Sequence, residues 1–143
     1  MSVMLGDMAV TAVVNYVNDR CIMSSSRHSV TGKCLPLVAY KYEKPSNIVG
    51  EYIAVNHLPF VHRSVVEEGI VNINIHVPKL KSGLPDTKRL SQLAQRIVEM
   101  FPEGTYLEKA FYEFLSDSRP TSDNDDTYYI NIQLNVIFNN LNS

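Results

Sequence analysis

The sequence has little of the material from which disulfide scaffolds and membrane spans are built. It has two cysteines, Cys21 and Cys34, and no tryptophan in 143 residues. Two cysteines are too few for a disulfide framework and form no CxxC pair, so we expect reduced cysteines that serve packing. The apolar runs are broken by Asn, Gly or Pro before the roughly 18 residues that a membrane helix needs. No membrane contact is therefore expected.

Neither sign of charge is in large excess. The 13 Lys and Arg against 15 Asp and Glu give a net charge of −2. A nearly neutral chain has no field that holds a polyanion, which disfavours free-standing nucleic-acid binding. The first charge is Asp7, so the start lacks the basic region of a secretion signal. Length and the 45% apolar fraction predict one domain, residues 1–143, made inside the cell.

Two segments have the spacing of helices. Residues 1–20 repeat apolar side chains on more than one side, which predicts a helix buried over most of its surface. Residues 86–101 follow Pro85, begin with Asp86 as the expected N-cap and carry one apolar stripe. The stripe consists of Leu90, Leu93, Ala94, Ile97, Val98 and Phe101. We expect this second helix to lie across a sheet with its stripe inward.

Strand patterns fill residues 35–77. Segments 37–43 and 50–57 are separated by turn residues and predict a hairpin, and 69–77 alternates with Val and Ile on one side. Residues 21–33, just before this region, are Ser-rich and predict a loop.

A long hairpin is predicted over residues 106–138. Residues 106–115 suit either a helix or a strand and are interpreted as a strand, and 116–126 as a mobile acidic loop. Residues 127–138 alternate without a break and predict a strand on the order of 40 Å long. Such a strand needs a long partner, and 106–115 is the adjacent candidate. The fold class is therefore α+β, with a mostly antiparallel sheet of four to five strands and two main helices packed on one face.

The sequence offers no catalytic or cofactor motif. It contains no GxGxxG, GxxxxGK[ST], GxSxG or HExxH, so we expect no enzyme and no cofactor. The histidines lack the HxH or HxxxH spacing of a metal pair, and the aspartates of 117–126 lack the glycine and distal glutamate of an EF-hand. The predicted metal ligands are therefore none, and the acidic run is interpreted as a solvated hairpin tip. The residues considered are His28, His57, His62, His76, Asp117, Asp123, Asp125 and Asp126.

Amide side chains repeat on the polar sides of two predicted strands. They are Asn72 and Asn74, joined by His76, and Asn131, Gln133 and Asn135. Amide side chains have poor β-propensity, so their repetition at strand positions needs an explanation. One reading is a solvent-facing sheet surface. The other is a face that packs against another subunit through uncharged hydrogen bonds, which suit symmetric assembly.

The block VNINIHVPKLKSGLPDTKRLSQLAQRIVEMF, residues 71–101, resembles the strand, loop and helix of bacteriophage tail-terminator or tail-completion proteins. The closing strand 128–138 is similar to theirs as well. The resemblance implies a structural virion protein that forms a ring, hexameric or alternatively dodecameric, at the head–tail junction as tail terminator, tail-completion protein or neck ring. It implies partners among portal, connector and tail-tube proteins, DNA passing through without sequence-specific binding, and assembly in the host cytoplasm.

The resemblance, together with the polar strand pattern, assigns subunit contacts to nine residues. They are Asn72, Asn74, His76, Lys79, Lys81, Tyr129, Asn131, Gln133 and Asn135. The alternative is a small α+β enzyme or ligand-binding domain with a pocket between helix and sheet, which a pocket joining His57, His62 and an acidic residue would support. A toxin, antitoxin or other regulator rests on size alone.

Overall fold

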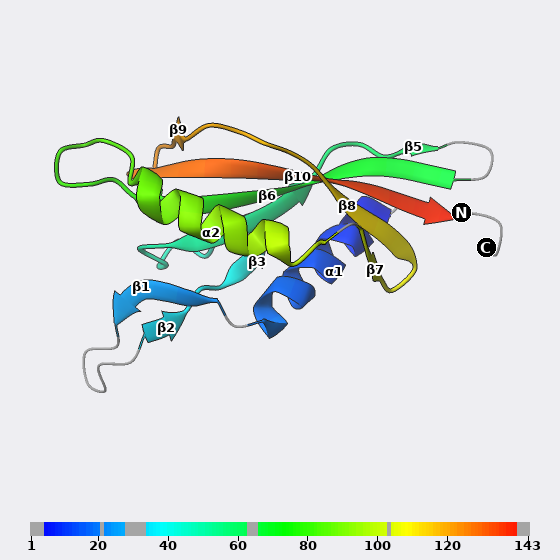
Figure 1. Ribbon diagram of the computed structural model, residues 1–143, viewed down its shortest axis with the longest axis horizontal. Coiled ribbons are helices and arrows are strands. Elements are labelled where there is room, and N and C mark those ends of the chain that lie inside the picture. Colours follow the sequence, from blue (N-terminus) through cyan, green and yellow to red (C-terminus); the bar gives the residue numbers. More distant parts are fainter. Residues whose placement is uncertain (1–4, 21, 28–33, 63–65, 103, 140–143) are drawn as a thin grey trace.

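The computed structural model describes residues 5–20, 22–27, 34–62, 66–102 and 104–139 (Figure 1). The helices are α1 (Leu5–Asp19) and α2 (Thr87–Glu99). The strands are β1 (Met23–Arg27), β2 (Cys34–Pro36), β3 (Ala39–Lys41), β4 (Tyr52–His57), β5 (Val61–His62), β6 (Val66–Pro78), β7 (Thr105–Leu107), β8 (Ala110–Asp117), β9 (Thr121–Ser122) and β10 (Thr127–Asn139). The α+β class is confirmed. No helix in these ranges is long and apolar enough to cross a membrane.

In the described residues the main sheet has eight strands, whereas four to five were predicted. Its path is β3-β4-β6-β10-β8-β7, with β5 beside β6 and β9 beside β10. The additional strands include β5 and β9, which have two residues each. A strand of two residues is too short to show an alternating pattern, so hydrophobic periodicity could not predict β5 or β9.

Strands β6 and β10 form the centre of the sheet. They pair antiparallel along their whole 13-residue lengths, from Thr127 opposite Pro78 to Asn139 opposite Val66. The long strand predicted at 127–138 is confirmed. Its full-length partner is β6, whereas the predicted partner segment pairs with it through β8, from Ala110 opposite Phe138 to Asp117 opposite Ile132. The segment 106–115 forms strands as predicted, yet it breaks into β7 and β8 around Glu108, whose φ of 55° reverses the chain. Residues 116–126, predicted as one loop, contain the end of β8 and all of β9.

The predicted hairpin of 37–43 and 50–57 is wrong, because β3 and β4 pair in parallel. Tyr42 follows β3 with a φ of 63° while its N–H still donates to Val55 O at 2.8 Å. The connection 42–51 then carries the chain back past the start of β3 before β4 begins. Turn residues signal a change of direction, but they do not show whether the chain turns once or twice.

The loop predicted at 21–33 includes a strand. β1 pairs antiparallel with β2 in a separate two-stranded sheet, and Figure 1 shows this ribbon apart from the main sheet. Residues 21 and 28–33 lie outside the described residues. The ribbon is anchored at its base, where Leu37 N–H donates to Ile22 O at 2.6 Å. The segment 21–33 has no run of alternating apolar residues, so its sequence showed no signal of a strand.

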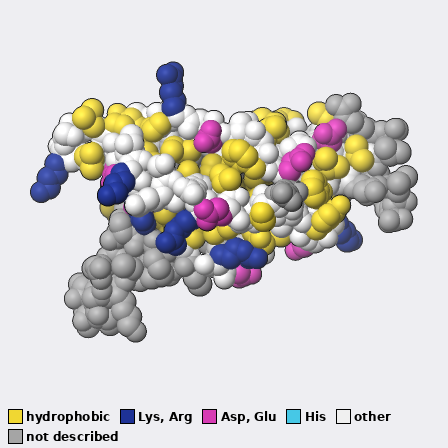
Figure 2. Space-filling model, in the orientation of Figure 1, with side chains coloured by type: hydrophobic (Ala, Val, Ile, Leu, Met, Phe, Trp, Pro, Cys, Tyr) yellow, Lys and Arg dark blue, Asp and Glu magenta, His cyan; other side chains and the backbone are white. Residues whose placement is uncertain are grey.

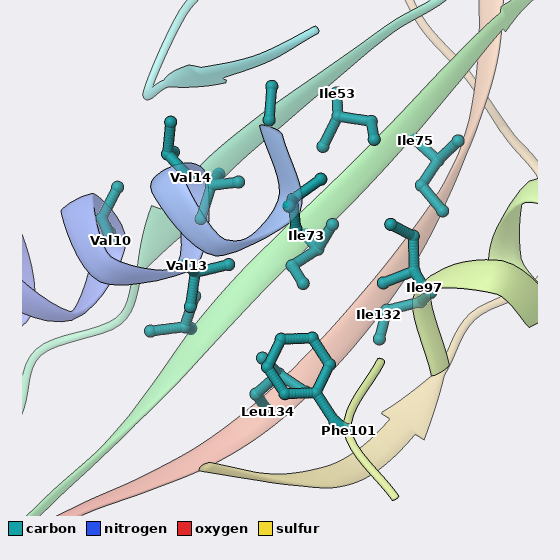
Figure 3. Close-up of a cluster of buried hydrophobic side chains, with 14 of the residues drawn as sticks. Val10, Val13, Val14, Ile53, Ile73, Ile75, Ile97, Phe101, Ile132 and Leu134 are labelled. Atoms are coloured by element: carbon teal, nitrogen blue, oxygen red, sulfur yellow. The ribbon is translucent and has the colours of Figure 1, made fainter. Parts of the chain in front are cut away.

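Both helices contribute to one apolar core on one face of the main sheet (Figure 3). Asp86 caps α2 as predicted, accepting from Arg89 N–H at 3.1 Å. The core is built from alternate residues of β6 and β10 and from the inward sides of the helices. It includes Val10, Val13, Ile73, Ile75, Leu90, Ile97, Ile132 and Leu134, each with no exposed surface. The polar residues that alternate with Ile73 and Ile132 therefore face away from the helices.

Candidate functional site

The face of the main sheet opposite the helices carries a band of hydrogen-bonded amides. Asn72, at its centre, is only 8% exposed and donates through Nδ2 to Asn56 Oδ1 at 2.9 Å. Its Oδ1 accepts from Asn131 Nδ2 and Gln133 Nε2, each at 3.1 Å. We call Asn56, Asn72, Asn74, Asn131, Gln133 and Ser116 the amide band. It crosses β4, β6, β10 and β8.

Each amide of the band makes at least one hydrogen bond within the sheet. Asn131 Nδ2 also donates to Asn74 Oδ1 at 2.9 Å, and Ser116 Oγ donates to Gln133 Oε1 at 3.1 Å. Cross-strand pairs of this kind stabilise a sheet and account for amides at strand positions that usually disfavour them. Covering such a face with another protein leaves fewer unpaired polar groups than covering a face whose amides bond only to water.

An aromatic stack continues the same face toward the end of the sheet where β10 begins. The ring of His76 lies between Tyr52 and Tyr129, with centroid distances of 4.3 and 5.0 Å and interplanar angles of 10° and 28°. The order follows from the register, since His76 pairs with Tyr129 on one side and Tyr52 on the other. The stack fixes the plane of the imidazole ring.

Two aspartates of the segment between β9 and β10 adjoin the stack. Asp125 accepts hydrogen bonds from the Tyr52 and Thr127 hydroxyls. Asp123 Oδ2 lies 3.6 Å from His76 Nδ1, which also lies 3.0 Å from Thr127 Oγ1. The acidic run interpreted as a solvated tip is therefore tied in part to the sheet face.

Burial and charge set the protonation of this cluster. Burial lowers the pKa of His76, and the nearby Asp125 and Asp123 only partly oppose that shift, so the imidazole is neutral near pH 7. Burial raises the pKa of Asp125, but the hydrogen bonds from Thr127 and Tyr52 outweigh it and the net pKa is lowered. Burial, followed by the bond to Asp125, raises the pKa of Tyr52. The cluster thus holds carboxylate, neutral imidazole and phenol.

A hollow of about 400 Å³ opens on this face beside the stack. Its lining includes Tyr42, Lys44, Tyr52, Asn74, His76 and Asp123. Lys44 Nζ lies 5.4 Å from the Tyr52 ring centroid and donates to Ile48 O. The hollow is therefore on the opposite side of the sheet from the place between helix and sheet where a ligand pocket was predicted as the alternative.

Most of the nine predicted contact residues share this face. Asn135 lies beyond the band and donates to Glu113 Oε1 at 3.3 Å. The two lysines lie away from it: Lys79 follows β6 with Nζ 3.9 Å from Asp126, and Lys81 is exposed in the next loop. Sequence reasoning missed Tyr52, which the register of β4 and β6 places opposite His76. It considered Asp125 but did not connect it with His76, because the contact runs through Tyr52 and Thr127.

The other histidines form no common site. His57, at the end of β4, makes a 2.8 Å contact through Nδ1 with Leu58 O, whereas His62 in β5 contacts Glu67 Oε1 at 2.7 Å. Both lie at strand positions. In the part of the chain that the structure describes, His57 and His62 thus have different partners, and no contact joins the two histidines with one acidic residue. His28 lies outside the described residues.

No family model and no curated protein matches this chain.

Proposed function

We propose that this protein is a structural subunit of a phage virion that assembles into a ring at the head–tail junction. The observation that carries the proposal is the polar sheet face, which combines three properties suited to burial between copies. Its centre bears no charged side chain, its amides already form hydrogen bonds with one another, and both described helices pack on the other face of the sheet. A like-on-like contact through such a face brings no repulsion between identical charges.

Two projections support the proposal. The β1–β2 ribbon stands apart from the main sheet, where it is available to reach a neighbouring subunit (Figure 1). The loop after β6 holds Leu80 and Leu84 outward, with 46% and 62% of their surfaces exposed. Exposed leucines on a tight loop are a cost to a lone monomer and a contact for a partner.

The charge distribution suits a channel through which DNA slides. On the face seen in Figure 2, Lys and Arg side chains stand among acidic and apolar ones. With a net charge of −2, the chain has little long-range attraction for duplex DNA. We expect the isolated protein to bind duplex DNA weakly and to release it as salt is raised.

The experiment is imaging and native mass spectrometry of the full chain, alone and with the portal, connector and tail-tube proteins of its own phage. We expect closed rings of six or twelve copies and attachment to a neck or tail partner. Monomers under every condition, or tight salt-resistant DNA binding by the isolated chain, would contradict the proposal. If rings form but bind none of the neck or tail proteins, the result would support ring assembly and refute the location at the head–tail junction.

A further inference from the structure

The cluster of His76, Asp123 and Asp125 has the ligands and the spacing of a metal site. Each side chain offers one ligand atom, and the three atoms lie within 4.8 Å of one another. His76 comes from β6, whereas the aspartates come from the segment that leads into β10. A cation among them would join two segments that are about fifty residues apart in sequence.

The carboxylates of this cluster have no cationic partner in the described part of the chain. Lys44 lines the hollow, but its ammonium donates to Ile48 O, and the ammonium of Lys79 lies 3.9 Å from Asp126. Among the described residues, the basic group within 4 Å of Asp123 is the imidazole of His76, whose side chain is 7% exposed. Two carboxylates therefore converge on one imidazole nitrogen, and a divalent cation between them would offset the negative charge that they bring together.

The surroundings hold the ligands in place. Tyr52 and Tyr129 fix the plane of the His76 ring, and Tyr52 also bonds to Asp125. Thr127 contacts both His76 and Asp125 through its hydroxyl. Hydrogen bonds to the ligands of a metal orient them and raise affinity. The adjoining hollow leaves room for water to complete the coordination.

We propose that His76, Asp123 and Asp125 bind one divalent transition-metal ion, of the class of Mn²⁺ or Zn²⁺. One imidazole nitrogen with two carboxylates suits such ions, whereas Mg²⁺ and Ca²⁺ prefer oxygen ligands alone. Binding through Nδ1 requires the imidazole proton to lie on Nε2. In the metal-free protein Thr127 Oγ1 donates its proton to Asp125, so its contact with His76 is a hydrogen bond only when Nδ1 carries the ring proton. That hydrogen bond is lost when Nδ1 binds the ion. The ion would fasten the β9–β10 segment to β6 on the same face that we propose is buried between subunits.

The test is calorimetric titration of the tag-free full chain, stripped with a chelator, with Mn²⁺ and separately with Zn²⁺. We expect one ion per chain, and Asp123→Asn should weaken binding by at least about tenfold. The matched control is Asp126→Asn in the same loop. The Asp126 side chain is 91% exposed, so its substitution should change the affinity for the metal by less than about twofold. Both positions are at the surface, so both variants are expected to fold, which circular dichroism checks.

A second readout follows the protonation of the His76 imidazole. In ¹⁵N-resolved spectra of the full chain, saturating Zn²⁺ should move the His76 proton to Nε2 and leave the His57 signals unchanged. Absence of binding, equal loss in Asp123→Asn and Asp126→Asn, or an unchanged His76 tautomer would overturn the proposal. If the oligomeric rings form equally well in the presence of chelator, the proposed function stands even without a metal. The two proposals can therefore fail separately.

Discussion

The substitution Asn72→Asp tests whether the amide band is a connected network. The aspartate keeps the shape of Asn72 and its acceptor oxygen but removes the N–H₂ that donates to Asn56 at 2.9 Å. It also places a charge at a position that is 8% exposed. Asn131 and Gln133 can still donate to the new carboxylate, which limits the loss.

The expected cost follows from these changes. Losing one hydrogen bond costs about 1 kcal/mol, and facing a desolvated carboxylate toward the oxygen of Asn56 adds about 1–3 kcal/mol. We therefore expect the free energy of unfolding to fall by about 2–4 kcal/mol at pH 7. With a urea m-value of about 2 kcal/mol/M, the midpoint of unfolding should fall by about 1–2 M.

The assay is urea unfolding followed by circular dichroism, with Asn47→Asp as the matched control. Asn47 is exposed in the connection between β3 and β4, so its substitution should cost less than about 0.5 kcal/mol. Burial should raise the pKa of the new carboxyl at position 72, so the folded form holds its proton at higher pH than the unfolded form. The deficit relative to wild type should therefore be largest at neutral pH and shrink as pH falls. Equal costs for the two variants, or a deficit that grows on acidification, would refute the network.

Two further substitutions test the packing around the core by urea unfolding. Arg89→Ala should lower the free energy of unfolding by about 3 kcal/mol, because it removes the guanidinium that bonds to the Glu51 carboxylate at 2.7 and 2.9 Å. The Glu51 side chain is only 2% exposed, so a loss of less than about 1 kcal/mol would contradict a buried ion pair. Gly104→Ala should cost about 2 kcal/mol or more, because φ is 96° and a Cβ would overlap the Phe111 ring. Gly83→Ala, with φ 85° and open space, should cost about 1 kcal/mol, and equal values for the two glycines would contradict the close approach.

Long periodic segments made most of the fold predictable. Alternation over 127–138 located β10, and the stripe with its Asp86 cap located α2 within two residues of its ends. These patterns span many residues, so no local irregularity hides them. Connections were less predictable, as the parallel pairing of β3 and β4 illustrates, because chain direction after a turn depends on tertiary packing.

The candidate site was predictable only in part. Alternation placed Asn72, Asn131 and Gln133 on one face, and the register then joined them directly. The partners of His76 could not be predicted from the sequence, because no spacing rule connects Tyr52 and Asp125 with His76 along the chain. The amides were expected to bond across a subunit contact, yet their hydrogen bonds run within the sheet. Contact between copies would then rest on shape and burial more than on those bonds.

The most direct test of the central proposal is assembly of the Asn74→Lys variant, followed by native mass spectrometry. Asn74 lies on the polar face beside the hollow, so a lysine there puts the same charge on every copy where copies are proposed to meet. Asn47→Lys adds the same charge at an exposed connection away from the face. We predict rings for wild type and Asn47→Lys, and folded monomers for Asn74→Lys. Rings of undiminished stability in Asn74→Lys, or monomers in all three proteins, would contradict the burial of this face between subunits.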